Sequence, residues 1–200
     1  MSSKKSRTRN KDKTIKKIVE TTLKLIDKNG YDKLSTNHVA EQAKLAIGTI
    51  YHHFPNGKAD IVRKITLQNF NKILHVNILK NIKDSNFEKS LRLIIKNHLH
   101  IHKSDFELNL AIEQAFLANR PIFNDYISSI DSELKNLAEL LSKLNRFKNI
   151  SKDELFKRIK ISFILLESII HYHLFFIPLF ENDEQVVQYL LELILHTFNR

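Results

Sequence analysis

The side chains of this chain that could carry chemistry fall into two groups, and the first is dominated by histidine. His98 and His102 lie four residues apart, a spacing that places both imidazoles on one face of a helix. Such a pair could bind a metal such as zinc with a third ligand from elsewhere, orient a polar group of a ligand, or lie hydrogen-bonded in the core. Because no HExxH motif or acidic neighbour accompanies the pair, we expect no metal site and no cofactor.

Catalytic motifs are missing from the sequence. It has no glycine-rich phosphate loop and no nucleophile with a base at a recognisable spacing, so we expect no enzyme. The absence of cysteine excludes disulfides, thiolate metal sites and cysteine nucleophiles together, and it is compatible with a reducing cytoplasm. The N-terminal stretch MSSKKSRTRNKDK lacks the apolar core of a secretory signal. A cytoplasmic location is therefore expected.

The second group of side chains that could carry chemistry lies between Ser35 and Asp60. Thr36 can cap a short helix, Lys44-Leu45-Ala46 is the length of a turn, and a second short helix spans residues 47–54 until Pro55-Asn56-Gly57 ends it. The spacing of Ile50 and Phe54 points both inward. The outward face then carries Thr49, Tyr51, His52 and His53. A short helix with an aromatic and polar outer face suits the major groove of DNA better than a protein core.

We therefore predict a set of DNA contacts in this helix-turn-helix. Tyr51, Thr49 and Lys58 are expected to contact phosphate, His52 could reach a base edge, and Ile47 could meet a thymine methyl or pack internally. The full predicted set is Thr36, Lys44, Ile47, Thr49, Tyr51, His52, His53 and Lys58. The charge distribution agrees: of a net charge of +10, residues 1–60 hold 13 Lys/Arg against 6 Asp/Glu. Phosphate binding by counterion release requires such a basic excess.

The stretch AKLAIGTIYHHF followed by PNGKADI resembles the DNA-binding signature of the TetR family of transcriptional regulators. The matching residues are Gly48, Thr49, Ile50, Tyr51, His53, Phe54 and Lys58. Lys44 stands where the family has a turn glycine, Ala46 where it has a capping serine, and Gly57 is one extra residue before Lys58. The resemblance implies a DNA-binding homodimer whose last two helices form a four-helix bundle with those of its partner.

Hydrophobic periodicity predicts an all-α fold. Only three Gly and three Pro in 200 residues favour long helices over sheets. We expect a basic, flexible arm over residues 1–12, a three-helix head ending near residue 58, and a larger helical ligand-binding and dimerisation domain over 59–200. Beside the two short helices above, the apolar repeats predict helices over 13–29, 58–81, 86–103, 106–118, 121–144, 151–177 and 183–199, about nine in total.

The last two predicted helices have more apolar surface than one core needs. We expect them to form a homodimer interface, with Leu190 and Ile194 facing the partner. Residues 161–180 could also suggest a membrane span, but Glu167, His171 and His173 argue against lipid burial. No membrane association is therefore expected.

Helical phase also predicts a pocket in the larger domain. Its expected lining residues are Phe70, Leu74, Ile78, Phe87, Ile94, His98, His102, Phe116, Phe123, Phe163 and Glu167. The leading hypothesis is a repressor that a small, mainly apolar ligand releases from a palindromic double-stranded operator. The alternative is a non-inducible DNA-binding protein, for chromosome organisation or cell division, that acts through a protein partner. An enclosed apolar cavity with a few polar groups would favour the first.

Overall fold

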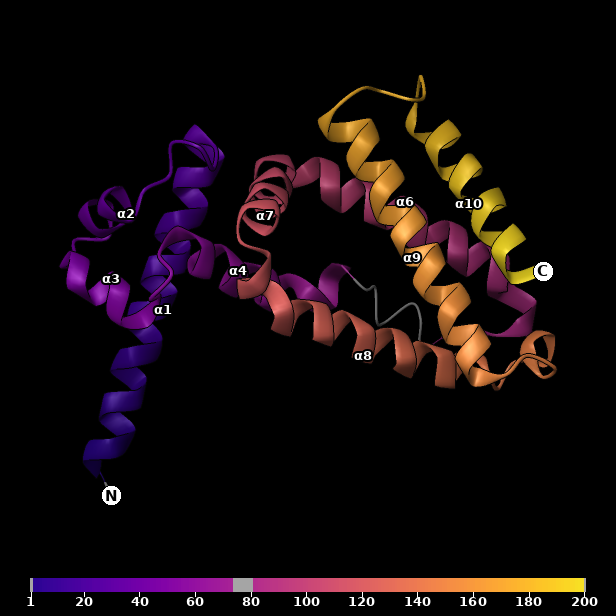
Figure 1. The fold of residues 1–200 in the computed structure, drawn as a ribbon, viewed down its shortest axis with the longest axis horizontal. Helices are drawn as coiled ribbons and strands as arrows, with labels where there is room; N and C mark the ends of the chain where they lie inside the picture. The colour runs from indigo at the N-terminus through magenta and orange to yellow at the C-terminus, as the bar shows by residue number, and fades with distance from the viewer. Residues whose placement is uncertain (1, 74–80, 200) are drawn as a thin grey trace. The chain divides into compact units, whose positions relative to one another are not determined.

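The computed structural model describes residues 2–73 and 81–199, with side chains for residues 10–68 and 81–198. Over this part of the chain every regular element is helical, which confirms the predicted all-α fold (Figure 1). Three short 3-10 helices cover Asp84–Asn86, Arg120–Phe123 and Asn145–Phe147. The α-helices are α1 Ser2–Asn29, α2 Thr36–Gln42, α3 Ile47–His53, α4 Lys58–Ile73, α6 Phe87–Ser104, α7 Phe106–Ala118, α8 Asn124–Leu141, α9 Lys152–Phe175 and α10 Asp183–Asn199.

The first helix is longer than the sequence pattern predicts. α1 begins at Ser2, whereas apolar periodicity predicts a start at residue 13 and a flexible arm before it. The expectation of a flexible arm was wrong because it used the apolar repeat, which begins only at Ile15. Between residues 2 and 29 there is no Gly or Pro, so nothing in the basic stretch ends the helix.

The described residues divide into two compact units. The first contains the chain up to Asn69 together with Asp105–Tyr126, and the second contains Phe70–Ser104 together with the chain from Ile127. Two helices, α4 and α8, contribute residues to both units. The functional boundary predicted after residue 58 concerns what each part binds, and it stays a prediction.

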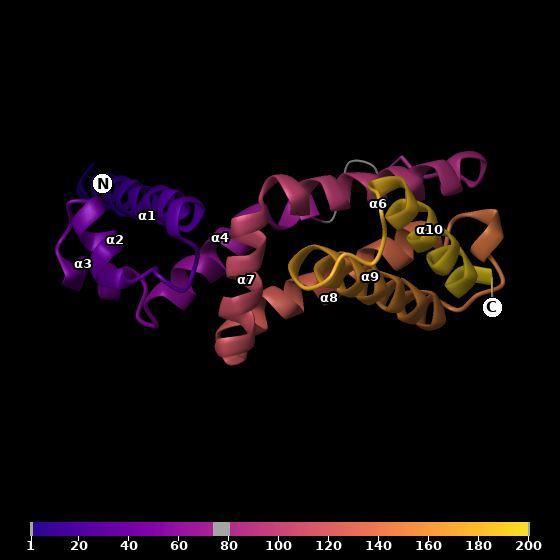
Figure 2. The same ribbon diagram turned by 90° about the horizontal axis from the view of Figure 1, so that it is seen from above.

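One hydrophobic core holds the helix-turn-helix in the first unit. Ile18 and Ile26 of α1, Val39 of α2, Ile50 of α3 and Ile61 of α4 are all buried in it. The neighbouring helices α1, α2 and α3 can be followed in Figures 1 and 2. Burial of branched side chains from four helices fixes the orientation of α3, because each is worth about 1.5–3 kcal/mol in the core.

The helix α7 belongs to this first unit although it lies far along the chain. It packs on α1, and its Ala111 and Ala115 are fully buried in the core that the two helices share. Small side chains at these two positions allow close packing against α1. The three-helix head therefore packs against a further helix, α7, beyond those expected from the sequence.

In the second unit α6, α9 and α10 pack against one another (Figure 1). At one end the rings of Phe87, Phe147 and Phe198 form a cluster with centroids 5.4 to 5.8 Å apart. At the other end Lys103 Nζ of α6 pairs with Asp183 of α10 at 2.8 Å. No helix among the described residues is both long and apolar enough to span a bilayer.

Candidate DNA-binding surface and ligand cavity

The turn between α2 and α3 is closed by backbone hydrogen bonds. Lys44 N donates to Glu41 O at 3.0 Å and Leu45 N donates to Ala40 O at 2.9 Å, the pair of bonds that defines a Schellman motif. This motif requires a left-handed residue, and Lys44 has φ 50°. The backbone therefore keeps its usual turn with lysine in place of glycine, at a cost of about 1 kcal/mol.

The cap of α2 differs from the prediction. Ser35 has extended backbone dihedrals and its Oγ accepts from His38 N at 3.1 Å, so Ser35 is the N-cap and Thr36 is the first helical residue. Adjacent serine and threonine both fit the capping pattern, and the backbone conformation decides between them. Thr36 is thereby left to make another contact: its Oγ1 lies 3.1 Å from the hydroxyl of Tyr51.

The outward face of α3 follows the predicted phase. Ile50 and Phe54 are buried, whereas Tyr51 is 48% exposed and Ile47 39% exposed. His52 is exposed, and Thr49 and His53 are half-buried. Ala46 is the N-cap residue of α3 and makes no side-chain cap, because an alanine side chain has no hydrogen-bond acceptor. The structure thus brings most of the predicted DNA contacts onto one accessible face.

Gly57 leaves space beside the Thr36 and Tyr51 side chains of this face. Its φ is 64°, a conformation that disfavours side chains, and a Cβ there would lie 3.3 Å from Thr36 Cγ2 and 3.8 Å from Tyr51 Cε1. The residue that is extra relative to the family pattern therefore makes room for the contact between Thr36 and Tyr51.

Lys58 makes an internal contact. Its Nζ donates to Tyr31 O at 3.0 Å and lies 4.1 Å from the centroid of the Tyr31 ring. The ammonium group thus ties the start of α4 to the segment after α1. Contact between Lys58 and phosphate stays a prediction, and the structure gives this side chain a positioning role as well.

Basic side chains lie near His53 at the end of α3. Burial, and then the charges of His52 and Lys11, lower the pKa of His53 below its usual value of 6.5. His53 is therefore mainly neutral at pH 7. The effect of Lys11 also shows that a basic residue from the first half of α1 lies within electrostatic reach of α3.

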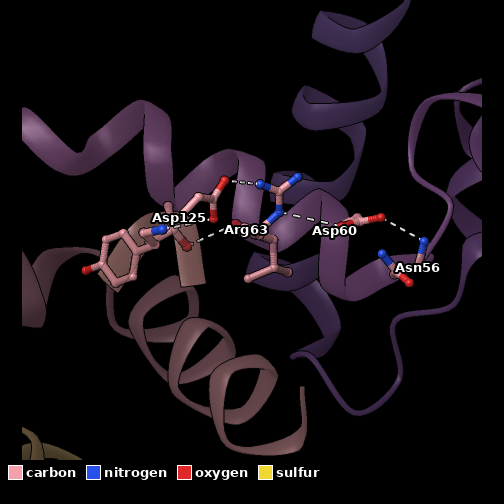
Figure 3. Close-up of polar contacts among 7 residues, drawn as sticks. Asn56, Asp60, Arg63 and Asp125 are labelled. Atoms are coloured by element: carbon pink, nitrogen blue, oxygen red, sulfur yellow. Dashed lines mark hydrogen bonds and ion pairs between the residues drawn. The ribbon is translucent and has the colours of Figure 1, made fainter. Parts of the chain in front are cut away.

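A chain of polar contacts connects the loop between α3 and α4 to α8 (Figure 3). Asp60 accepts from Asn56 N at 2.7 Å and pairs with Arg63 Nε at 3.5 Å. Arg63 also pairs with Asp125, whose other oxygen accepts from Tyr126 N at 2.9 Å. Asp60 is nearly buried, so Arg63 balances its charge. This network runs between the two helices, α4 and α8, that contribute to both compact units.

The second unit contains an apolar cavity of about 90 Å³. Among the residues with described side chains, only His98 and Ser162 contribute polar groups to its wall. The volume is below the roughly 300–1,000 Å³ of typical ligand pockets. The lining residues are Ile82, Phe87, Leu91, Ile94, His98, Leu134, Leu137, Leu141, Ile159, Ser162, Phe163, Leu166, Ile194 and Phe198.

The predicted pocket residues separate into four sets, of which the last, His102 and Glu167, is described below. Phe87, Ile94, His98 and Phe163 line this cavity. Phe116 and Phe123 do not, because they pack with each other at 5.6 Å in the core of the first unit. Helical phase shows that a side chain points inward, but it does not show which helix it meets. The side chains of Phe70, Leu74 and Ile78 lie outside the described residues.

His102 and Glu167, the remaining predicted pocket residues, meet beside His98. Glu167 Oε1 lies 2.9 Å from His98 Nε2, and Oε2 lies 3.6 Å from His102 Nε2 and 3.1 Å from His171 Nε2. Burial raises the pKa of Glu167, but the charge of His98 and hydrogen bonds with His102, His171 and His98 outweigh it, so the pKa is well below 4.5. The acidic neighbour that the sequence around His98 lacks is supplied by α9.

The helix-turn-helix matches a family model. Residues 18–65 match the model described as bacterial regulatory proteins, tetR family. The helix-turn-helix region of this chain is thus of the TetR-family type. Its fold agrees: the fatty acid degradation regulator FadR of Bacillus halodurans superposes with a TM-score of 0.67 over 90% of this chain and 94% of that one, at 16% identity.

Curated TetR-family relatives show modest similarity. The chain is 29% identical over 129 residues to the HTH-type transcriptional repressor KstR of Rhodococcus jostii, covering 64% of this chain and 56% of that protein. It is 27% identical over 126 residues to the fatty acid metabolism regulator protein of Bacillus subtilis, covering 58% and 64%. The chain thus spans less than two thirds of the length of either relative.

Proposed function

We propose that the protein is a homodimeric repressor that binds a palindromic operator through α3 and is released when a small, mainly apolar molecule enters the second unit. The observation that carries this proposal is the face of α3, where Tyr51, His52 and Ile47 are accessible while Ile50 and Phe54 anchor the helix in the core. Short, rigidly anchored helices of this kind read base edges in the major groove.

A dimer follows from the size of this reading element. Seven residues of helix span only about 10 Å, which is too short to specify a site alone. Two copies related by a dyad would contact grooves about 34–36 Å apart and so read a palindrome.

The proposed dimer surface lies on α9 and the segment that follows it. Ile161, Ile164 and Tyr172 share one face of α9 and are exposed, as are Phe176 and Ile177 beyond its end. The expectation that Leu190 and Ile194 face the partner was wrong, because both are buried in the chain's own second unit. Among the described residues of α10, Tyr189 is the large apolar side chain that is exposed there.

The apolar cavity supports release by a ligand. Its wall is almost entirely Leu, Ile and Phe, with His98 and Ser162 available to orient one polar group. A ligand larger than a few atoms must enlarge this cavity. Its binding would therefore favour a conformation in which the helices around the cavity lie further apart. A ligand shifts such an equilibrium only by its differential affinity for the two states.

The small volume favours a second candidate. A cavity of about 90 Å³ in a TetR-family protein fits a DNA-binding protein without an inducer, which would act through a protein partner. The two candidates differ in whether any small molecule changes the affinity for DNA.

The test begins with selection of DNA from a random pool by the purified protein. We expect a palindrome with half-sites one helical turn apart. Lys44→Ala should then lower the slope of log affinity against log salt by about 0.9 if Lys44 contacts phosphate. The matched control is Lys96→Ala, an exposed lysine on α6, which should leave the slope unchanged. Equal slopes for both variants, or selection of no palindrome, would contradict the proposal.

A further inference from the structure

Four titratable side chains from two helices converge in the second unit beside the cavity. His98 and His102 lie one turn apart on α6, and Glu167 and His171 lie one turn apart on α9. His98 and His102 are almost fully buried, whereas Glu167 is 21% and His171 22% exposed. Two facing pairs of this kind are a common way of building an ion site inside a helical bundle.

The hydrogen bond of His102 fixes its tautomer. Its Nδ1 lies 3.0 Å from the backbone oxygen of His98. A carbonyl oxygen only accepts, so Nδ1 carries a hydrogen and donates it. In the neutral ring Nε2 therefore presents a lone pair, and it faces Glu167 Oε2 at 3.6 Å. The contact therefore needs a cation between the two atoms, which is either the proton of the hydrogen bond between His102 and Glu167 described above or a metal ion.

The same hydrogen bond is typical of metal ligands. A histidine that binds a metal through one ring nitrogen usually donates the other N–H to a carbonyl or carboxylate, which orients the ring. One ligand atom each from His98, His102 and Glu167 can be chosen so that all lie within 4.8 Å of one another. Tetrahedral ligands at about 2.0–2.1 Å from zinc lie about 3.3 Å apart, so small side-chain rotations would close the site.

We infer that His98, His102 and Glu167 form a binding site for a divalent transition metal of the zinc class, with His171 as a fourth ligand. Imidazole nitrogens with one carboxylate oxygen suit Zn²⁺ better than Mg²⁺ or Ca²⁺, which prefer oxygen ligands. The site lies within one compact unit and is independent of the DNA-binding face, so this inference does not rest on the proposed function. The other possible occupant is a proton shared within the cluster.

The experiment uses the full chain after dialysis against a chelator. Titration with Co²⁺ should give one ion per chain with the intense visible absorption of tetrahedral coordination, and Zn²⁺ should displace it. Zn²⁺ affinity is then measured by competition with a chromophoric chelator. Glu167→Gln and His102→Gln should each lower this affinity at least tenfold, the least that loss of even a supporting partner usually costs.

The matched control is His100→Gln, because His100 lies on the same helix and is exposed. It should leave the affinity and the cobalt spectrum unchanged. Circular dichroism of each variant without metal shows whether it is folded. If His102→Gln does not fold, the Zn²⁺ affinities of Glu167→Gln and His171→Gln test the site instead. Uptake of no metal would mean that the cluster holds only a proton. Equal losses in His100→Gln would place the metal at surface histidines. Either outcome overturns the inference.

Discussion

Thr36 Oγ1 and Tyr51 Oη lie 3.1 Å apart, so the first residue of α2 contacts the outward face of α3 across the helix-turn-helix. Both hydroxyls are accessible, and Gly57 leaves the space in which they meet. The contact holds the Tyr51 ring in one orientation at the surface where a phosphate is expected. A side chain oriented before binding loses less conformational entropy when it contacts DNA.

Tyr51→Phe is therefore expected to weaken binding to the selected operator and to unrelated DNA by similar factors. The variant loses a hydrogen bond worth about 0.5–1.5 kcal/mol, while the ring stays on α3. Because no positive charge is removed, the slope of log affinity against log salt should not change. Fluorescence anisotropy at several salt concentrations measures both quantities. The control is Tyr189→Phe, an exposed tyrosine on α10. A loss confined to the operator would show that Tyr51 contacts bases instead.

Gly57→Ala should destabilise the protein by about 1 kcal/mol, because alanine is strained at φ 64°. It should also weaken DNA binding, since its Cβ would lie close enough to Thr36 Cγ2 to shift Thr36 and so disturb its contact with Tyr51. Gly48→Ala is the matched comparison: a Cβ on α3 at this position meets no atom of the protein within 4 Å. That variant should be as stable as the parent or more so, because alanine favours helices by about 1 kcal/mol. Thermal unfolding that ranks the two variants the other way would contradict this account.

Replacement of Ile164 by Glu should produce monomers. Ile164 is 51% exposed on the apolar face of α9, and two symmetry-related carboxylates would be buried against each other in the proposed interface. Sedimentation velocity measures the result. Leu117→Glu serves as the control, since Leu117 is a still more exposed apolar residue but lies on α7 in the first unit. If Leu117→Glu dissociates the dimer and Ile164→Glu does not, the interface lies elsewhere.

The carboxylate of Glu167 gives a prediction for acid pH. Its pKa is lowered in the folded protein, so its contribution to stability is complete above its usual pKa of 4.5 and is lost as the pH falls toward the folded-state value. The free energy of unfolding of the parent should fall more steeply below pH 4.5 than that of Glu167→Gln. Denaturant titrations from pH 3 to 7, each on metal-free protein, test this. Glu181→Gln removes an exposed carboxylate and should follow the parent curve.

Local signals in the sequence predicted most helices well. The bounds of α7 and α10 agree with the predicted residues, and α3 keeps its predicted phase, because 3.6-residue periodicity reports directly which face is buried. The choice of Ser35 over Thr36 as cap and the extension of α1 to Ser2 were missed. Both depend on the backbone conformation of polar residues, which carry no apolar pattern.

Contacts between distant segments were the larger source of error. Phe123 was expected at the pocket but fills the core of the first unit, and Leu190 was expected at a subunit interface but is buried within the second. Each is an inward-facing residue whose neighbours only the tertiary fold determines. Helical phase placed His98 and Glu167 in one predicted pocket, but it did not predict their direct contact, since they lie on different helices and no spacing rule relates the two.

Induction is the prediction that separates a ligand-controlled repressor from a constitutive DNA-binding protein. Small molecules that copurify with the protein are first identified by mass spectrometry after denaturation, and 1-anilinonaphthalene-8-sulfonate serves as a fluorescent apolar probe of the cavity. Leu137→Trp should fill much of the space, because Leu137 lines the cavity and is half-buried, so a larger ring can be accommodated. It should weaken probe binding and leave operator affinity without the probe unchanged.

Coupling between the two sites must be reciprocal. If the probe or a copurified molecule lowers operator affinity tenfold, which corresponds to about 1.4 kcal/mol, the operator must lower the affinity for that molecule tenfold. Arg63 on α4, which also pairs with Asp60, pairs with Asp125 on α8 and so joins the two helices that contribute to both units; Arg63→Ala should therefore reduce this factor. Titration of the molecule with and without operator gives the factor for parent and variant. Equal affinities in both titrations of the parent would exclude induction by that molecule and favour the non-inducible candidate.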